Sequence, residues 1–175
     1  MSHTTEAKFV PLNIAVLTVS DTRTAATDRS GDILAQRLED AGHHLMKRQI
    51  CPDNQADIVE VLESWIAHED IDVVLTTGGT GVTGRDVTPE ALQQVWQKEI
   101  PGFGELFRML SYQKIGTSTI QSRACAGVAN GTYIFALPGS TGAVKDAWDD
   151  ILVYQLDIRH RPCNFAELLP RLKEV

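Results

Sequence analysis

Residues 73–91 read VVLTTGGTGVTGRDVTPEA, and this stretch indicates both the fold and the kind of ligand. An apolar run typical of a strand leads into a loop rich in glycine and threonine, and Asp86 then precedes a helix that a proline begins. Glycines leave room for a ligand and permit positive φ, and backbone N–H groups in such loops and at helix N-termini bind anions. The stretch therefore predicts a site for a phosphate-bearing ligand. The loop contains four glycines, Gly78, Gly79, Gly81 and Gly84.

Strands and helices alternate on both sides of this stretch. Apolar runs predict strands at 12–19, 43–51, 71–76 and 131–137, and helical spacing predicts helices at 30–41, 55–67, from 88, 101–111 and 142–156, with a short turn at 164–169. Residues 116–127 show no clear pattern. We expect Ser30, Thr88 and Ser140 to be N-caps and Gly42 to end the first helix.

This alternation predicts an α/β fold with a largely parallel sheet. Ligands bind such sheets beyond the carboxyl ends of the strands, where the strand order switches direction. We therefore expect the loops that follow three of the strands to meet at one edge of the sheet. These loops are Ser20-Asp21, Gly78–Asp86 and Pro138–Thr141.

Composition sets the broad class. The 175 residues predict one domain over 12–175 behind a flexible segment over 1–11, and they contain no apolar run of membrane-spanning length. The N-terminal residues lack the apolar core of a secretory signal, so we expect a cytoplasmic protein. A net charge of −7 argues against a nucleic-acid surface. The three cysteines and five histidines are scattered, which argues against a disulfide framework and against a zinc site.

Two common phosphate motifs do not explain the glycine loop. A P-loop requires a Gly-Lys pair, and the chain contains none. The spacing of Gly79, Gly81 and Gly84 matches the letters of the dinucleotide fingerprint, but in that motif the loop opens directly into a helix. Here residues 85–87 intervene, so we give the nicotinamide and flavin interpretations little weight.

The whole pattern instead resembles a known family. TTGGTGVTGRDVTPEA, with Pro138-Gly139-Ser140 downstream, is similar to the molybdenum cofactor biosynthesis domain, which molybdopterin adenylyltransferases share with molybdenum cofactor biosynthesis protein B. The resemblance runs from Ile14 to about Leu169, and residues 102–141 and 155–170 look most like the protein B branch. It implies a three-layer α/β/α fold, a homotrimer or a dimer of trimers, and molybdopterin as a ligand.

The resemblance also implies a reaction and its catalytic residues. In the adenylyltransferases the terminal phosphate of molybdopterin attacks the α-phosphorus of ATP, and pyrophosphate leaves. Mg²⁺ commonly assists such transfers, with ATP as the co-substrate. The two functional aspartates of the family match Asp53 and Asp86, which we expect to be catalytic and to be the candidate metal ligands. Both residues also have structural interpretations, Asp53 as a turn former and Asp86 as an acid near a helix start.

Further residues are expected to bind substrate. They are Ser20, Asp21, Gly78, Gly79, Thr80, Gly81, Arg123, Pro138, Gly139 and Ser140. Arg123, with Lys145 as a second candidate, would balance phosphate charge, although Arg123 could instead form an ion pair between subunits. Two other functions stay open: binding of molybdopterin or a precursor without transfer, and a scaffold role in assembly.

Overall fold

A computed structural model describes residues 7–175, so the predicted flexible segment lies partly outside the described residues. The chain forms these elements: β1 (Asn13–Val19), α1 (Arg29–Asp40), β2 (His44–Cys51), α2 (Gln55–Ile66), β3 (Val73–Thr77), α3 (Thr88–Val95), β4 (Lys98–Glu99), α4 (Pro101–Ile115), η1 (Gly116–Gln121), β5 (Cys125–Ala129), β6 (Thr132–Leu137), α5 (Thr141–Ala147), η2 (Trp148–Leu152), α6 (Val153–Gln155), α7 (Phe165–Leu168) and η3 (Leu169–Arg171). The α/β class predicted from the sequence is confirmed.

The strands form one six-stranded sheet in the order β2-β1-β3-β6-β5-β4. β2, β1, β3 and β6 are parallel, whereas β5 runs antiparallel to β6 and β4 antiparallel to β5. From β1 the chain passes to β2 on one side and then returns to β3 on the other. The strand order therefore switches between β1 and β3, where a parallel sheet opens a ligand crevice at its carboxyl ends.

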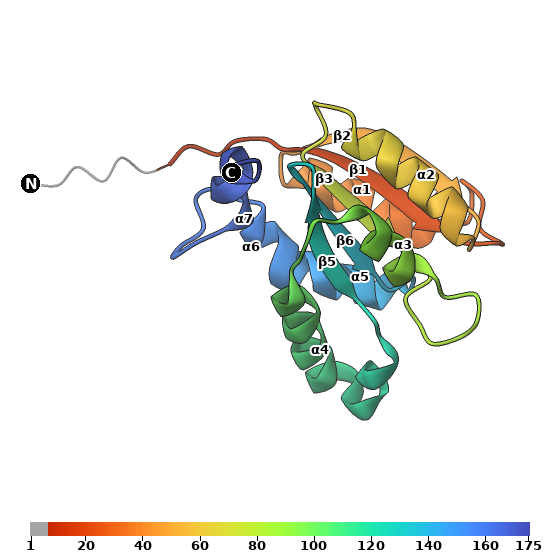
Figure 1. The fold of residues 1–175 in the computed structure, drawn as a ribbon. Coiled ribbons are helices and arrows are strands. Elements are labelled where there is room, and N and C mark those ends of the chain that lie inside the picture. The colour runs from red at the N-terminus through yellow and green to blue at the C-terminus, as the bar shows by residue number, and fades with distance from the viewer. Residues whose placement is uncertain (1–6) are drawn as a thin grey trace, which may run out of the picture.

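Helices cover both faces of the sheet, which makes three layers (Figure 1). Alternate residues of each strand point to opposite faces, so β1 sends Ile14 and Val16 to one core and Ala15 and Leu17 to the other. The first core packs against α1, α4 and α5, and the second against α2 and α3. Because the central strands are buried on both faces, their sequences are apolar almost throughout.

Several predicted element ends are corrected. Helix α1 begins at Arg29, one residue before the predicted start, because Asp28 rather than Ser30 is the N-cap and its carboxylate accepts the N–H of Gly31 at 3.0 Å. Thr88 is not an N-cap, since Val87 holds that position. Helix α4 extends to Ile115 instead of residue 111, and the last long helix contains a π-helical turn, η2.

Other local predictions are confirmed. Gly42 follows the end of α1 with φ +92°, and Ser140 caps α5 by accepting the N–H of Ala143 at 3.2 Å. The three cysteines are free. Residues 116–127, for which the sequence showed no pattern, form η1 and the start of β5.

Candidate functional site

A cleft of about 390 Å³ lies at the carboxyl end of β3 and β6. The glycine loop (Gly78–Asp86) and the Pro138–Ser140 loop form one side, and α4 with η1 forms the other. Its principal lining residues are Gly78, Gly79, Thr80, Gly81, Asp86, Pro138, Gly139 and Ser140 from the two loops, and Phe107, Ser111, Ile115, Ser118, Thr119 and Gln121 from the helical side. The cleft therefore unites eight of the residues predicted from the sequence.

Two glycines of the loop are required by its geometry. Gly78 and Gly79 have φ of +104° and +67°, in the region that favours glycine. A Cβ on Gly78 would lie 2.2 Å from the carbonyl oxygen of Val19, so the loop packs directly on the end of β1. Gly84 differs, because it has open space around it and no positive φ. The geometry of the described residues therefore does not require glycine at position 84.

The loops around the cleft present unused backbone donors. Among residues 7–175, the amide N–H groups of Gly79, Thr80, Gly139 and Ser140 donate no hydrogen bond within the chain. Gly78 differs, since its N–H donates to the carbonyl of Leu137 at 3.0 Å. Buried or half-buried N–H groups without partners are costly unless water or a ligand accepts from them. Such donors suit an anionic ligand.

Two side chains, those of Thr88 and Arg123, hold the glycine loop in place through its backbone carbonyls. The buried hydroxyl of Thr88 donates to the carbonyl of Gly78 at 2.8 Å, which explains why Thr88 does not cap its own helix. Arg123 donates to the carbonyls of Gly81 at 2.6 Å and Asp86 at 2.7 Å, and it forms an ion pair with Glu90. Arg123 thus holds the loop, and it does not line the cleft.

Asp86 lines the cleft as a fixed carboxylate. Its Oδ2 accepts from the backbone N–H of Thr83 at 2.8 Å and from the Thr83 hydroxyl at 2.7 Å. Burial raises the pKa of this carboxyl, but the hydrogen bonds from Thr83 and Gly81 and the charge of Arg123 outweigh burial and lower it. Asp86 is therefore an ionised group whose orientation is set before any ligand binds.

Asp53 lies one loop further along the sheet edge, outside the cleft lining. Its Oδ2 accepts the N–H of Asp21 at 2.9 Å, and Asp53 donates its own N–H to Asp21 at 3.0 Å. Its Oδ1 faces the glycine loop, 3.2 Å from where a Cβ on Gly79 would be. Burial raises the pKa of Asp53, and the carboxylates of Asp21 and Asp86 add to the rise. The two predicted catalytic carboxylates therefore have pKa values shifted in opposite directions.

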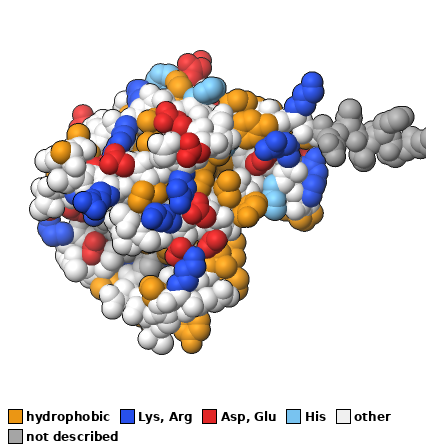
Figure 2. Space-filling view, turned by 180° about the vertical axis from the view of Figure 1, so that it is seen from behind, with side chains coloured by type: hydrophobic (Ala, Val, Ile, Leu, Met, Phe, Trp, Pro, Cys, Tyr) orange, Lys and Arg blue, Asp and Glu red, His pale blue; other side chains and the backbone are white. Residues whose placement is uncertain are grey.

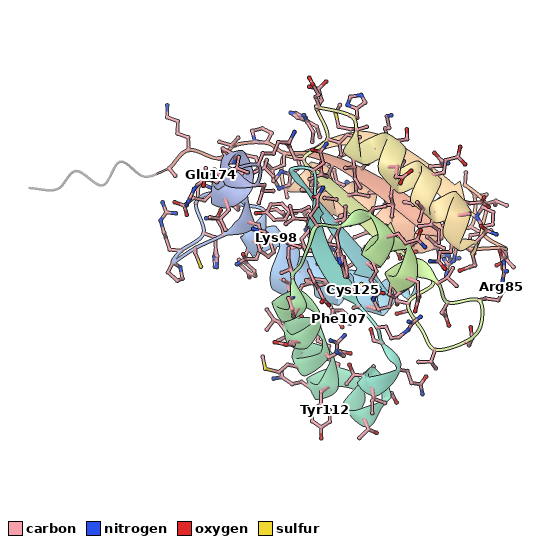
Figure 3. All side chains as sticks on the ribbon, viewed as in Figure 1. Arg85, Lys98, Phe107, Tyr112, Cys125 and Glu174 are labelled. Atoms are coloured by element: carbon pink, nitrogen blue, oxygen red, sulfur yellow. The ribbon has the colours of Figure 1, made fainter. Side chains whose placement is uncertain are left out.

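Asp21 joins three loops instead of lining the cleft. Besides its reciprocal bonds with Asp53, it accepts from Arg85 Nε at 3.0 Å and from Arg85 Nη2 at 2.7 Å. Figure 3 places Arg85 at the outer end of the glycine loop, away from Phe107 on α4. The exposed ion pair thereby links the loops after β1 and β3, and the hydrogen bonds with Asp53 add the loop after β2.

Ser20 organises the loop after β1. Its Oγ accepts the N–H groups of Thr22 at 3.2 Å and Arg23 at 3.1 Å, which turns the chain at the end of the strand. The half-buried side chain of Arg23 then reaches the loop after β6, where Nη2 donates to the carbonyl of Gly139 at 3.4 Å. Arg23 was not among the site residues predicted from the sequence, although its place just beyond the carboxyl end of β1 was a usable signal.

A buried network anchors this loop at its far end. The carboxylate of Asp28 is 0% exposed and accepts from the Thr18 hydroxyl at 2.7 Å and from Arg48 Nη2 at 2.9 Å. Burial raises the pKa of Asp28, and the bonds from Arg48, Thr18 and Gly31 more than compensate, so the pKa is lowered. Asp28 therefore fixes where the loop ends and α1 begins.

The helical wall of the cleft was not predicted. Phe107 and Ile115 contribute apolar surface, while Ser111, Thr119 and Gln121 contribute hydroxyl and amide groups. A wall of this kind suits a flat ring with hydrogen-bonding edges. The only signal in the sequence was the abundance of small and hydroxyl residues at 116–127, which carries no period.

Three further observations concern surface charge, metal ligands and membrane-spanning helices. Charged side chains of both signs are interspersed over the face shown in Figure 2, without a broad basic area on that face. Within residues 7–175, no group of three or more His, Cys, Asp or Glu side chains is arranged to hold a metal ion. No helix in that part of the chain is long and apolar enough to cross a membrane.

The fold and the cleft define an α/β protein with a cleft suited to an anionic ligand at the carboxyl ends of two parallel strands, β3 and β6. The family described as "Probable molybdopterin binding domain" matches residues 15–158. Molybdenum cofactor biosynthesis protein B of Escherichia coli (strain K12) is 52% identical over 167 residues, which cover 95% of this chain and 96% of that protein. The chain belongs to this family of molybdopterin-binding domains.

Solved structures agree with this assignment. A crystal structure of molybdenum cofactor biosynthesis protein B matches with a TM-score of 0.85 and 40% identity, covering 95% of this chain and 98% of that one. The tungsten cofactor synthesizing protein MoaB from Pyrococcus furiosus matches with a TM-score of 0.77 and 33% identity, covering 94% and 98%. These similarities confirm the family resemblance, and they assign the chain to molybdenum cofactor biosynthesis.

Proposed function

We propose that this protein binds molybdopterin in the cleft and transfers an adenylyl group from ATP to its terminal phosphate. The observation that carries the proposal is the meeting of unpaired backbone N–H groups with the ionised Asp86 in one cleft, in a chain of the molybdopterin-binding family. The N–H groups suit phosphate oxygens, and the wall of α4 and η1 suits the pterin ring.

The proposed reaction is a displacement at phosphorus. An oxygen of the molybdopterin phosphate attacks the α-phosphorus of ATP, and a new P–O bond forms. The bond from the α-phosphorus to the oxygen bridging to the β-phosphorus breaks, and pyrophosphate leaves with that oxygen. Catalysis of this kind depends mainly on positioning and charge neutralisation. The loop donors at Gly79 and Gly139 would hold the reacting phosphate, and Asp86 would hold a cation that offsets the phosphate charge.

The two aspartates are compatible with Mg²⁺. This ion usually binds through one or two carboxylates and completes its shell with substrate phosphates and water, so a larger group of protein ligands is not needed. Asp86 would hold the ion together with Asp53, whose Oδ1 faces the glycine loop. When bound, Mg²⁺ would neutralise charge on the triphosphate.

An assay with purified protein, molybdopterin, ATP and Mg²⁺ tests the proposal through adenylylated pterin and pyrophosphate. We expect wild-type turnover, loss of turnover in Asp86→Asn with pterin binding retained, and normal turnover in Asp70→Asn. Asp70 is a matched control because it is an exposed aspartate that precedes β3, at the opposite end of the strand from the cleft. Absence of product with the wild-type protein would refute adenylyl transfer.

The alternative is a protein that binds molybdopterin, or a precursor, without transfer. One observation favours it: Asp53 does not line the cleft, and its Oδ2 is held by the N–H of Asp21. In that case the same assay yields pterin binding without pyrophosphate. A rise in melting temperature with Mg-ATP would count against this alternative, because only a ligand selective for the native state stabilises it.

The proposed assembly is a homotrimer or a dimer of trimers. It is supported by the exposed apolar side chains of Met109, Tyr112, Ile115 and Ile120, which are 57%, 58%, 55% and 80% exposed. Figure 3 shows Tyr112 at the outer end of α4, pointing away from the sheet. Exposed apolar surface of this kind is typical of an interface. Light scattering measures the assembly mass, and a monomer would contradict the proposal.

A further inference from the structure

The cations near the cleft differ in how firmly they are held. Arg123 is held by Glu90 and by two carbonyls of the glycine loop. Arg85 is held by both oxygens of Asp21. Arg23 has no carboxylate partner among residues 7–175, and the carbonyl of Gly139 is the acceptor it contacts there. Of these three arginines, Arg23 therefore has the guanidinium that is most nearly free for a ligand.

Arg23, like Arg123, does not line the cleft, but its contact with Gly139, which does, places it beside the cleft. Ser20 turns the chain so that Arg23 extends from the end of β1 across β3 to the loop after β6. Where Arg23 contacts Gly139, the backbones of Gly78 and Gly139 lie close together. A Cβ on Gly139 would be 3.2 Å from the Cα of Gly78. Both glycines line the cleft, and Gly139 offers an unpaired N–H.

We propose that Arg23 binds the phosphate of the ligand in the cleft, a role for which the sequence favoured Arg123, with Lys145 as a second candidate. The inference rests on the proposed binding of molybdopterin, and it does not depend on adenylyl transfer. At 3.4 Å the bond to the Gly139 carbonyl is longer than a normal N–H···O bond, so a phosphate oxygen can replace it at little cost. A guanidinium also has a planar set of five N–H donors that matches phosphate geometry.

The competing arginines would have to give up stronger contacts. For Arg85 to reach a phosphate, three hydrogen bonds to Asp21 of 2.7–3.0 Å must break. For Arg123 to do so, it must leave Glu90 and release the carbonyls of Gly81 and Asp86. Those carbonyls belong to the loop that forms the site, so the second change would also loosen the donors that the phosphate needs.

The test compares two ligands, molybdopterin and a pterin that lacks the phosphate, by isothermal titration calorimetry. We expect Arg23→Ala to weaken molybdopterin binding about tenfold to a hundredfold, as loss of a charge-assisted hydrogen bond does, and to change binding of the phosphate-free pterin less than about twofold. Arg23→Gln, which keeps a polar side chain without the charge, should lose nearly as much, and Arg23→Lys should lose less. Arg29→Ala is the matched control, since it removes the same charge from the exposed start of α1.

The results separate this inference from the proposed function. Equal molybdopterin affinity in wild type and Arg23→Ala would overturn it, as would an equal loss for both ligands, which would mean that Arg23 only supports the loop. If Arg23→Ala lowers the melting temperature, its affinities also reflect damage to the fold. The affinities of Arg23→Gln for the two ligands then decide instead. Wild-type protein that binds molybdopterin without forming pyrophosphate would refute adenylyl transfer and leave the Arg23 comparison valid. Failure of the wild type to bind molybdopterin would overturn both.

Discussion

Replacing Gly78 by alanine should destabilise the folded protein much more than the same change at Gly84. At Gly78 the new Cβ would lie 2.2 Å from the carbonyl oxygen of Val19, and φ is +104°. A positive φ costs a residue with a Cβ about 1–2 kcal/mol, and forcing packed backbone apart costs about 1–3 kcal/mol. The free energy of unfolding should therefore fall by about 2–5 kcal/mol, with a fall in melting temperature of about 4–20 °C.

Gly84 is the control because it lies in the same loop, has no atom within 4 Å of its Cβ position and has no positive φ. Gly84→Ala should change the free energy of unfolding by less than about 0.5 kcal/mol. Urea unfolding followed by circular dichroism measures both variants, and an unchanged urea dependence would show that the denatured state is unaffected. If the free energies of unfolding of the two variants differ by less than about 0.5 kcal/mol, the close packing of the glycine loop on β1 is not what stabilises this edge of the sheet.

Three further results are expected. Burial lowers the pKa of His43 to about 4, so the folded protein favours the neutral imidazole. The free energy of unfolding should therefore be highest above about pH 6.5 and should fall by about 3 kcal/mol as the pH drops toward 4. Denaturant titrations across that range should show a weaker fall in His43→Asn, which can still accept a backbone N–H. The fall should be only slightly smaller in the exposed control His44→Asn, because the charge of His44 is a minor cause of the lowered His43 pKa. Asp28→Ala leaves buried donors unpaired and should lower the free energy of unfolding by about 3–5 kcal/mol; a loss below about 1 kcal/mol in urea would contradict the buried network. Arg123→Leu and Glu90→Gln should weaken molybdopterin binding by similar factors in calorimetry, because both loosen the glycine loop, whereas an effect of Arg123→Leu alone would indicate direct contact with the ligand.

The strand and helix pattern was largely predictable because it depends on local spacing of apolar residues. The runs at 12–19, 71–76 and 131–137 correspond to β1, β3 and β6 within two residues. Helix ends were less predictable, because caps depend on tertiary partners. Ser30 is a reasonable N-cap in isolation, but Thr18 and Arg48 fix the carboxylate of Asp28 and so favour Asp28 as the cap.

The site was predictable only in part. The glycine loop, Asp86 and Pro138–Ser140 do line one cleft, as the parallel sheet requires of loops at one edge. Ser20, Asp21, Asp53 and Arg123 lie around the cleft without lining it. They hold the loops together, and in a sequence a charged residue that binds a loop cannot be told from one that binds a ligand.

The sequence by itself determined the α/β class, the glycine loop and the family, because each depends on residues that are close along the chain. Only the tertiary structure decided which charged groups are already paired and which are free. The reason is the strand order, which sets β1 beside β3 and β3 beside β6 although long segments separate them in the chain. That order brings Arg23 to Gly139, across 116 positions, and it leaves Arg123 beneath the loop that it was expected to face.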